Sequence, residues 1–186
     1  MSTIKHSYKF DENLKHPQGI MIHRLGKKNA GKIYLPSEHL EIAQRIYNSL
    51  RVKYQIETES EKLIGKSEMI VENDEVQCNC KIEVMLSGAD LIEQVEKIHS
   101  KFISKYQTFN IFLNISDPKS IESYNALTKI GYFFAGFQPL CSECEIMVLH
   151  NPQKVPINMQ TFTLTPKFRK ICDYVEKFYN ERCQKP

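Results

Sequence analysis

The chain has 186 residues, a net charge of +3 and 41% hydrophobic residues. A chain of this length and composition can bury a core of its own, and it typically forms one domain or one domain with an appendage. The charge is small and the basic residues are interleaved with acidic ones, which argues against binding to nucleic acid or to an anionic membrane surface. We therefore expect an ordinary globular protein.

The sequence contains no segment that would place the protein in a membrane. No stretch reaches the roughly 20 apolar residues that span a bilayer, and residues 1–16 are polar, without the apolar core of a signal peptide. The six cysteines are unevenly spaced in a chain too large to need disulfides. We expect a cytoplasmic protein with reduced thiols.

The N-terminal part predicts a polar lead-in followed by a β-hairpin. Residues 1–19 show no hydrophobic period, so we expect them to pack loosely. Two short apolar stretches, 20–25 and 32–35, flank a segment with two glycines and an asparagine, which favours a turn. These features predict two strands joined by a solvated loop.

A helix is predicted next. Pro36 ends the preceding strand, Ser37 can cap a helix, and apolar residues then recur every three to four positions as far as Leu50. Glu38 and His39 lie in the first turn of this helix. We expect both on the surface, because one histidine by itself defines no ligand set.

The middle of the chain predicts two strands. Residues 52–56 alternate between apolar and polar and lead into a charged turn at 57–62. Over residues 75–84 the alternation is strict, which predicts a strand with one buried and one solvated face. Cys78 and Cys80 would then both face inward.

The next segment predicts two consecutive strand–helix units. A helix is expected over 89–106 and an alternating strand over 109–114. Residues 116–118, Ser-Asp-Pro, supply a cap and a proline for the first turn, so the following helix should begin at about this proline. Gly131 can take the left-handed conformation that ends the helix, and an aromatic strand over 132–138 would return in parallel.

The C-terminal part predicts a strand and a last helix. Residues 146–149 are typical of an antiparallel return strand, and residues 151–158 contain two prolines, which favours a connecting loop. Pro166 opens a helix with a long apolar side, which needs a surface to pack on. The expected division is a lead-in at 1–19, one domain at 20–150, and a linker with a helix packing on that domain at 151–186.

Three parts of the sequence together resemble a known family: residues 33–50 (IYLPSEHLEIAQRIYNSL), 87–91 (SGADL) and 113–140 (LNISDPKSIESYNALTKIGYFFAGFQPL). The most specific piece is GYFFAG at 131–136, with the Asp-Pro pair at 117–118 upstream. They resemble the GNAT-type N-acetyltransferases, and in particular a GNAT-like module that forms the C-terminal part of longer bacterial proteins.

The resemblance covers residues 31–149 and implies a mixed α/β fold of the GNAT type with a C-terminal helical extension. In active members, backbone amides after the fourth strand hold the pyrophosphate of acetyl-CoA at a helix N-terminus. In this chain one glycine and one alanine of that loop remain, the usual arginine or glutamine is absent, and Asp90 adds a negative charge. The residues that would hold acetyl-CoA or CoA are Val84, Met85, Leu86, Ser87, Gly88 and Ala89.

Many active family members place a tyrosine four residues before the glycine of a Gly-aromatic pair, where its hydroxyl can protonate the leaving thiolate. Here that position is Leu127. Tyr124, one turn earlier, and Tyr132, directly after the glycine, are the candidates for a displaced general acid, and core packing is the alternative for both. The candidates for a general base, chosen by location alone, are Glu75, Glu83 and His99.

The cysteines could instead form a metal site or a redox pair. Cys78 with Cys80, and Cys141 with Cys144, would supply four thiolates, which are good ligands for zinc and for iron–sulfur clusters. If the GNAT order holds, the first pair lies within a strand and the second at the tip of another hairpin, which separates them. The second pair also does not open a helix after a strand, as a thioredoxin-like pair would. We expect structural thiols and no metal.

Two functions from different classes follow. The chain either transfers an acetyl group from acetyl-CoA to an amine substrate, or is a catalytically degenerate GNAT-fold module that binds a ligand or a protein partner. The family resemblance favours the first function, whereas the altered loop and the absent tyrosine favour the second. A third possibility, an adaptor unrelated to CoA, would be favoured by an exposed apolar face on the last helix.

Overall fold

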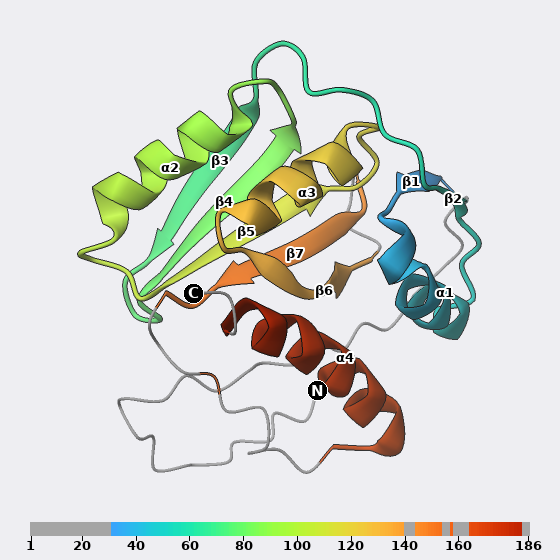
Figure 1. Ribbon diagram of the computed structural model, residues 1–186. Helices are drawn as coiled ribbons and strands as arrows, with labels where there is room; N and C mark the ends of the chain where they lie inside the picture. Colours follow the sequence, from blue (N-terminus) through green and yellow to red (C-terminus); the bar gives the residue numbers. More distant parts are fainter. Residues whose placement is uncertain (1–30, 140–143, 154–156, 158–163, 184–186) are drawn as a thin grey trace.

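The computed structural model describes residues 31–139, 144–153, 157 and 164–183. Figure 1 shows a five-stranded sheet flanked by helices, with a smaller two-stranded sheet beside it. The fold is mixed α/β, as the sequence predicts. The elements are β1 (Lys32–Tyr34), the 3-10 helix η1 (Ser37–His39), α1 (Leu40–Ser49), β2 (Gln55–Glu57), β3 (Glu68–Asp74), β4 (Asn79–Leu86), α2 (Leu91–Phe102), β5 (Thr108–Asn114), α3 (Ser120–Lys129), β6 (Phe133–Gln138), β7 (Ile146–Asn151) and α4 (Pro166–Cys183).

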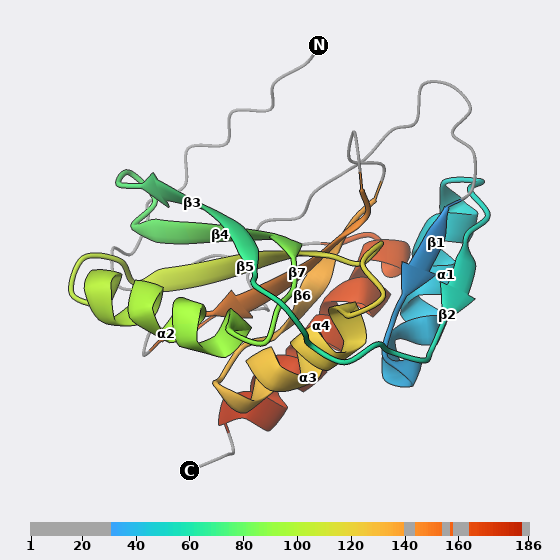
Figure 2. The same ribbon diagram turned by 90° about the horizontal axis from the view of Figure 1, so that it is seen from above.

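The large sheet has the strand order β3-β4-β5-β7-β6. Among its described strands, only β4 and β5 are parallel neighbours, and α2 connects them. β5 and β6 run in the same direction, as predicted, but the antiparallel strand β7 lies between them. Figures 1 and 2 show α2 and α3 on one face of the sheet and α4 beside β6.

The connection from α3 to β6 follows the predicted glycine signal. Gly131 has a φ of 94°, and the N–H of Tyr132 donates to the carbonyl of Leu127 at 3.2 Å. A left-handed residue at this place ends the helix and satisfies one of its last carbonyls. The chain then turns directly into β6.

Two helices are shorter than predicted. α2 begins and ends inside the expected range 89–106, and α3 begins at Ser120 rather than at Pro118. The Asp117 carboxylate accepts the N–H of Lys119 at 3.0 Å, and the Asp117 carbonyl accepts that of Ser120 at 3.0 Å. These bonds form a separate turn ahead of α3, so the aspartate caps that turn and not the helix.

The sequence does not predict β3, and it places the start of β4 too early. β3 pairs antiparallel with β4, and the turn between them uses residues that the alternation assigned to a strand. Val76 is 95% exposed in this turn, and Cys78 has a φ of 48° there, so the prediction that Cys78 faces inward from a strand is wrong. Cys80, in β4, is buried as predicted.

The small sheet consists of β1 and β2 in the described part of the chain. The expected first strand, residues 20–25, lies outside the described residues, and β1 instead pairs in parallel with β2. The N–H of Leu35 donates to the carbonyl of Glu57 at 3.0 Å, and the N–H of Tyr34 donates to that of Ile115 at 2.8 Å. The second bond joins the small sheet to the chain just beyond β5.

The last helix covers the edge of β6. His39 of η1 was expected on the surface, but it is fully buried, with its ring 4.3 Å from that of Phe134 in β6 and 5.0 Å from that of Phe178 in α4. Tyr174 of α4 also packs on Phe134, at 5.7 Å. The apolar side of α4 therefore faces the core. None of the described helices is long and apolar enough to cross a membrane.

Candidate functional site

The predicted cofactor loop runs from the end of β4 into α2. Its backbone N–H groups decide whether it can hold a phosphate, because they would be the donors. All three N–H groups at residues 87–89 already donate to acceptors of the protein. The bonds are Ser87 N–H to Asp117 Oδ2 at 3.0 Å, Gly88 N–H to Ser67 Oγ at 2.9 Å and Ala89 N–H to the Gly65 carbonyl at 3.0 Å.

Gly88 is packed against another stretch of backbone. A Cβ atom at this position would lie 2.4 Å from the carbonyl carbon of Lys66 and 2.5 Å from the nitrogen of Ser67. Backbone atoms cannot move aside as the end of a flexible side chain can, so this contact excludes a larger residue. The stretch that leads into β3 therefore closes the loop on this side.

Asp90, the residue directly before α2, has a carboxylate that is bonded within the chain. Asp90 accepts the N–H of Ser67 at 2.7 Å and the side-chain amide of Gln94 at 2.6 Å. The hydrogen bond from Ser67, followed by that from Gln94, lowers the pKa of Asp90, so the group is ionised at neutral pH. It places a negative charge beside the N-terminus of α2, although it caps no N–H group of that helix.

The other polar groups near the loop are bonded or enclosed. The Lys119 ammonium donates to the Ser87 carbonyl at 2.7 Å, and the Asn114 amide donates to the Met85 carbonyl at 3.1 Å, where the backbone pairing of β4 with β5 ends. The Ser87 hydroxyl has no hydrogen-bond partner in the described part of the chain, but Ser87 is only 1% exposed. Of the remaining predicted loop residues, Val84 is buried, Met85 is half-buried, Gly88 is buried, and Leu86 and Ala89 are exposed.

Tyr124, the first candidate acid, lies on α3 with its hydroxyl bonded to η1. The hydroxyl donates to the Glu38 carboxylate at 2.9 Å, and Tyr124 is 3% exposed. Burial, followed by the nearby charge of Glu38, raises the pKa of Tyr124. A phenol with a raised pKa is a weaker proton donor to a leaving thiolate.

His39 completes this cluster between η1, α3 and α4. The Tyr174 hydroxyl donates to the Glu38 carbonyl at 2.7 Å and lies 2.9 Å from His39 Nδ1, which assigns the proton to Nδ1. Burial, and next the charge of Lys177, lowers the pKa of His39 to about 3. The imidazole is therefore neutral, and its 3.7 Å approach to the Glu38 carboxylate is not an ion pair.

Tyr132, the second candidate acid, lies near the opposite end of α2 from the loop. Its hydroxyl is 2.7 Å from Nε2 of His99, and Tyr132 is 2% exposed. His99 follows Leu91, the first residue of α2, by eight positions, which is about 12 Å along the helix axis. The structure does not bring Tyr124, Tyr132 and the loop together in one site.

The carboxylates considered as bases form ion pairs on the solvated side of the β3–β4 hairpin. Glu75 lies 2.6 Å from the Lys105 ammonium, and this hydrogen bond lowers the pKa of Glu75, which weakens it as a base. Glu83 pairs with Lys81, which also bonds Glu72 at 3.0 Å. Neither Glu75 nor Glu83 has a predicted acid beside it.

The cysteines that the structure describes do not gather. Burial raises the pKa of the Cys80 thiol to about 11, so it stays protonated and is a poor metal ligand. Cys78 precedes β4 and Cys144 precedes β7, at opposite ends of β5, whose seven residues span roughly 20 Å. Cys141 lies outside the described residues. Within the described ranges, no group of three histidine, cysteine or acidic side chains could hold a metal ion.

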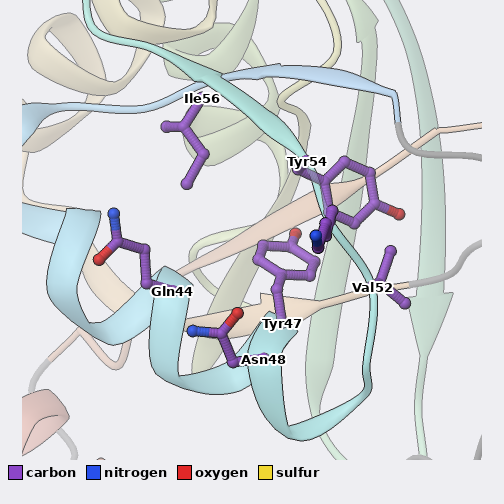
Figure 3. Close-up of a pocket in the computed structure, with 7 residues that line it drawn as sticks. Gln44, Tyr47, Asn48, Val52, Tyr54 and Ile56 are labelled. Carbon is purple, nitrogen blue, oxygen red and sulfur yellow. The ribbon is translucent and has the colours of Figure 1, made fainter.

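A hollow of about 360 Å³ lies between α1 and the segment that leads into β2, away from the predicted residues (Figure 3). The rings of Tyr47 and Tyr54 lie 4.6 Å apart, and their hydroxyls donate to the buried Glu145 at 3.3 and 2.5 Å. These hydrogen bonds join the walls of the hollow to Glu145, which directly precedes β7. The hollow is lined by Gln44, Tyr47, Asn48, Val52, Lys53, Tyr54 and Ile56.

No protein-family model matches the chain, and no curated protein matches it. The GNAT resemblance therefore stays a prediction, and the geometry of the loop carries the functional argument. The sequence gives Asp117 only a capping role, although its carboxylate also accepts the Ser87 N–H. Nothing in the sequence relates Ser67 to Gly88, because they are 21 residues apart and belong to different elements.

Proposed function

We propose that this chain is a catalytically degenerate GNAT-like module that does not bind acyl-CoA and acts through a protein partner. The observation that carries the proposal is that the three N–H groups at 87–89 donate to acceptors of the chain itself. A pyrophosphate would need these groups as its donors. Binding it here would break three internal hydrogen bonds and displace residues 65–67.

Charge at the loop also opposes an anionic cofactor. The Asp90 carboxylate lies at the N-terminus of α2, and the Asp117 carboxylate is bonded to the first N–H of the loop. A pyrophosphate at this place would face both negative charges at short range. The nearby Lys119 ammonium is already bonded to the Ser87 carbonyl.

Both candidate proton donors for acyl transfer are held inside the protein. Tyr124 is bonded to η1 and Tyr132 to the far end of α2, and both are almost fully buried. A general acid must lie within hydrogen-bond reach of the atom it protonates. Hydroxyls that are buried and bonded within the chain support the degenerate module over the active enzyme.

The GNAT-like part of the proposal is supported by two features of the fold. β4 and β5 are parallel neighbours joined by α2, with the predicted cofactor loop at the β4–α2 junction. Gly131 and Tyr132 connect the end of α3 to β6. Both features agree with what the resemblance implies for this part of the chain.

The test is calorimetric titration of the purified protein with acetyl-CoA and with free CoA. We expect no heat of binding up to about 1 mM ligand, a concentration at which even weak complexes form. Micromolar binding with one ligand per chain would overturn the proposal and favour acyl transfer to an amine. A bulky residue at Gly88 is not a usable control, because it would collide with the backbone at Lys66 and Ser67.

A matched pair of variants tests whether any CoA binding occurs at the loop. Asp90→Asn removes a negative charge from the loop, and Asp74→Asn removes one from a carboxylate that likewise accepts a backbone N–H, that of Gln77 at 2.9 Å. Under the proposal, neither variant binds CoA. If the loop does hold CoA, Asp90→Asn should bind it more tightly than Asp74→Asn does.

A further inference from the structure

One edge of the large sheet is open. β3 pairs with β4 over seven residue pairs, and no other described segment pairs with it. At the opposite edge, β6 lies beside α4 (Figure 1). An edge strand presents a row of backbone N–H and C=O groups that can pair with a strand from another molecule.

β3 has acidic side chains and one bulge, but it lacks the other features that protect edge strands from pairing. Such strands are commonly short, or carry lysine or proline, or are covered by a helix. β3 is as long as β5 and contains no lysine, arginine or proline. Its one irregularity is a bulge between Glu68 and Met69, so the rest of the strand is regular. At its centre, Ile70 is 50% exposed and Val71 is 37% exposed.

The same edge is acidic, although the whole chain is basic. Residues 68–75 contain four carboxylates and no lysine or arginine, whereas the chain as a whole has a net charge of +3. Lys81, on β4, bonds Glu72 and Glu83, and Lys105 bonds Glu75 at 2.6 Å, so these two lysines offset part of the charge. The charge of the edge therefore favours a basic partner.

A hollow adjoins the open edge on the sheet face opposite α2. It has a volume of about 500 Å³ and is lined by β3, β4, the turn between them and Phe112 of β5. The carboxylates of Glu72, Asp74 and Glu75 reach it, and the ring of Phe112 already has the Lys81 ammonium 4.9 Å from its centroid. Carboxylates and an aromatic ring are groups that attract a lysine or arginine side chain.

A second copy of this chain would bring two acidic strands together, because each β3 carries Glu68, Glu72 and Asp74. Antiparallel pairing of β3 with itself, centred on Val71, would place Glu68 opposite Asp74 and Glu72 opposite Ile70. Like charges directly opposite each other destabilise a strand pair. The repulsion would recur at both ends of the pair, since each strand contributes the same residues.

We propose that the β3 edge binds an extended, basic segment of a partner protein by strand addition. This inference rests on the proposed function, because it names the partner class through which the module acts. Main-chain hydrogen bonds to β3 supply affinity, and alternate side chains of the segment supply specificity. Basic side chains meet Glu72 and Asp74 on one face, and apolar side chains meet Val71 on the other.

The probe is a synthetic peptide of roughly nine residues that alternates lysine and valine, a length typical of one strand. Calorimetry measures its binding to the full chain, and hydrogen exchange measures protection of the β3 amides. We expect binding with one peptide per chain that weakens as salt is added, with protection confined to β3 and its neighbours. A glutamate–valine peptide of equal length should not bind.

Two protein variants separate strand addition from general charge attraction. Ile70→Lys places a positive charge in the middle of the edge, and Val76→Lys places the same charge in the adjacent turn at a residue that is 95% exposed. We expect Ile70→Lys to weaken peptide binding by about tenfold or more, and Val76→Lys to weaken it by less than about threefold. Thermal unfolding of both variants checks that the fold is retained.

The outcomes are distinct for the inference and for the proposed function. No peptide binding at about 1 mM, equal effects of the two variants, or unchanged binding of a peptide N-methylated at alternate residues would each overturn strand addition. A dimer that Ile70→Lys dissociates in sedimentation experiments would assign the edge to a second copy instead. CoA binding would overturn the proposed function whether or not the peptide binds. If neither CoA nor the peptide binds, only the proposal of strand addition is overturned.

Discussion

The two edges of the large sheet differ in how far they are covered. At β6, aromatic side chains pack under α4, and Phe133 and Phe134 are 3% and 0% exposed. At β3, no described helix covers the strand, and Ile70 and Val71 at its centre are 50% and 37% exposed. The backbone has unpaired groups at both edges, and among the described residues only the β6 edge is covered.

The polar contacts differ between the edges as much as the apolar ones. Around β6, His39 and Tyr174 bond to each other among aromatic rings, in surroundings where a lost bond is costly. Around β3, the carboxylates of Glu72 and Glu75 pair with lysines in contact with solvent, where ion pairs contribute little. We infer that stability is concentrated on the β6 side, while the β3 side is free to bind.

The largest expected effect compares one residue from each edge. Phe134→Ala removes a fully buried ring and should lower the free energy of unfolding by about 3–5 kcal/mol. Val71→Ala, at a residue that is 37% exposed, should lower it by less than about 1 kcal/mol. Urea unfolding of both variants measures the difference. Similar losses would contradict the concentration of stability on the β6 side.

The sequence predicts the elements of the covered side well because their signals are local. The glycine at 131 marks the end of α3 through its positive φ, and the spacing of apolar residues marks α1, α2 and α4. β3 gives no such signal, because it carries three acidic residues and its apolar residues, Met69, Ile70 and Val71, are consecutive rather than alternating. A strand that is apolar on neither face cannot be found from alternation.

The candidate site is predicted less well, because its geometry depends on contacts between distant segments. The position of the loop follows from the strand-to-helix pattern, but its closure depends on Gly65 and Ser67, which precede β3. The burial of His39 likewise requires α4, which begins more than a hundred residues later. One histidine at the start of a predicted helix carries no sign of that contact.

The second prediction concerns pH and tests whether His39 is buried as a neutral group. Its pKa is lowered from 6.5 to about 3 in the folded protein, mainly by burial and then by Lys177. Between these values the unfolded chain binds the proton and the folded chain does not, so stability is lost as pH falls below 6.5. From pH 7 to pH 5 this histidine should lower the free energy of unfolding by about 2 kcal/mol.

The control for this prediction is His39→Phe, which keeps a ring in the aromatic cluster but cannot titrate. Chemical unfolding at several pH values gives the slope for each protein. The variant should lose about 2 kcal/mol less than the parent over the same range. Parallel slopes would show that His39 takes up its proton in the folded protein as readily as in the unfolded chain, and would contradict the lowered pKa.

The third prediction addresses the bonds that hold α4 over the β6 edge. Tyr174→Phe keeps the ring but removes the hydroxyl, which donates to the Glu38 carbonyl and accepts from His39 Nδ1. We expect a loss of about 1–2 kcal/mol in the free energy of unfolding, because a buried imidazole N–H then has no partner. Tyr54→Phe offers a comparison away from α4. If only Tyr174→Phe increases proteolysis within α4, the hydroxyl holds the helix in place.

The smallest expected effect on stability is at the open edge, where binding should change instead. Glu72→Gln removes a charge whose side chain is 59% exposed and pairs with Lys81 at 3.0 Å, so the free energy of unfolding should change by less than about 0.5 kcal/mol. The same substitution removes a carboxylate from the surface that faces the lysine–valine peptide, and should weaken that binding by about threefold or more. Urea unfolding and calorimetry on one preparation measure both quantities. A large loss of stability without a change in binding would mean that β3 contributes to the core, as β6 does, and would reverse the contrast between the two edges.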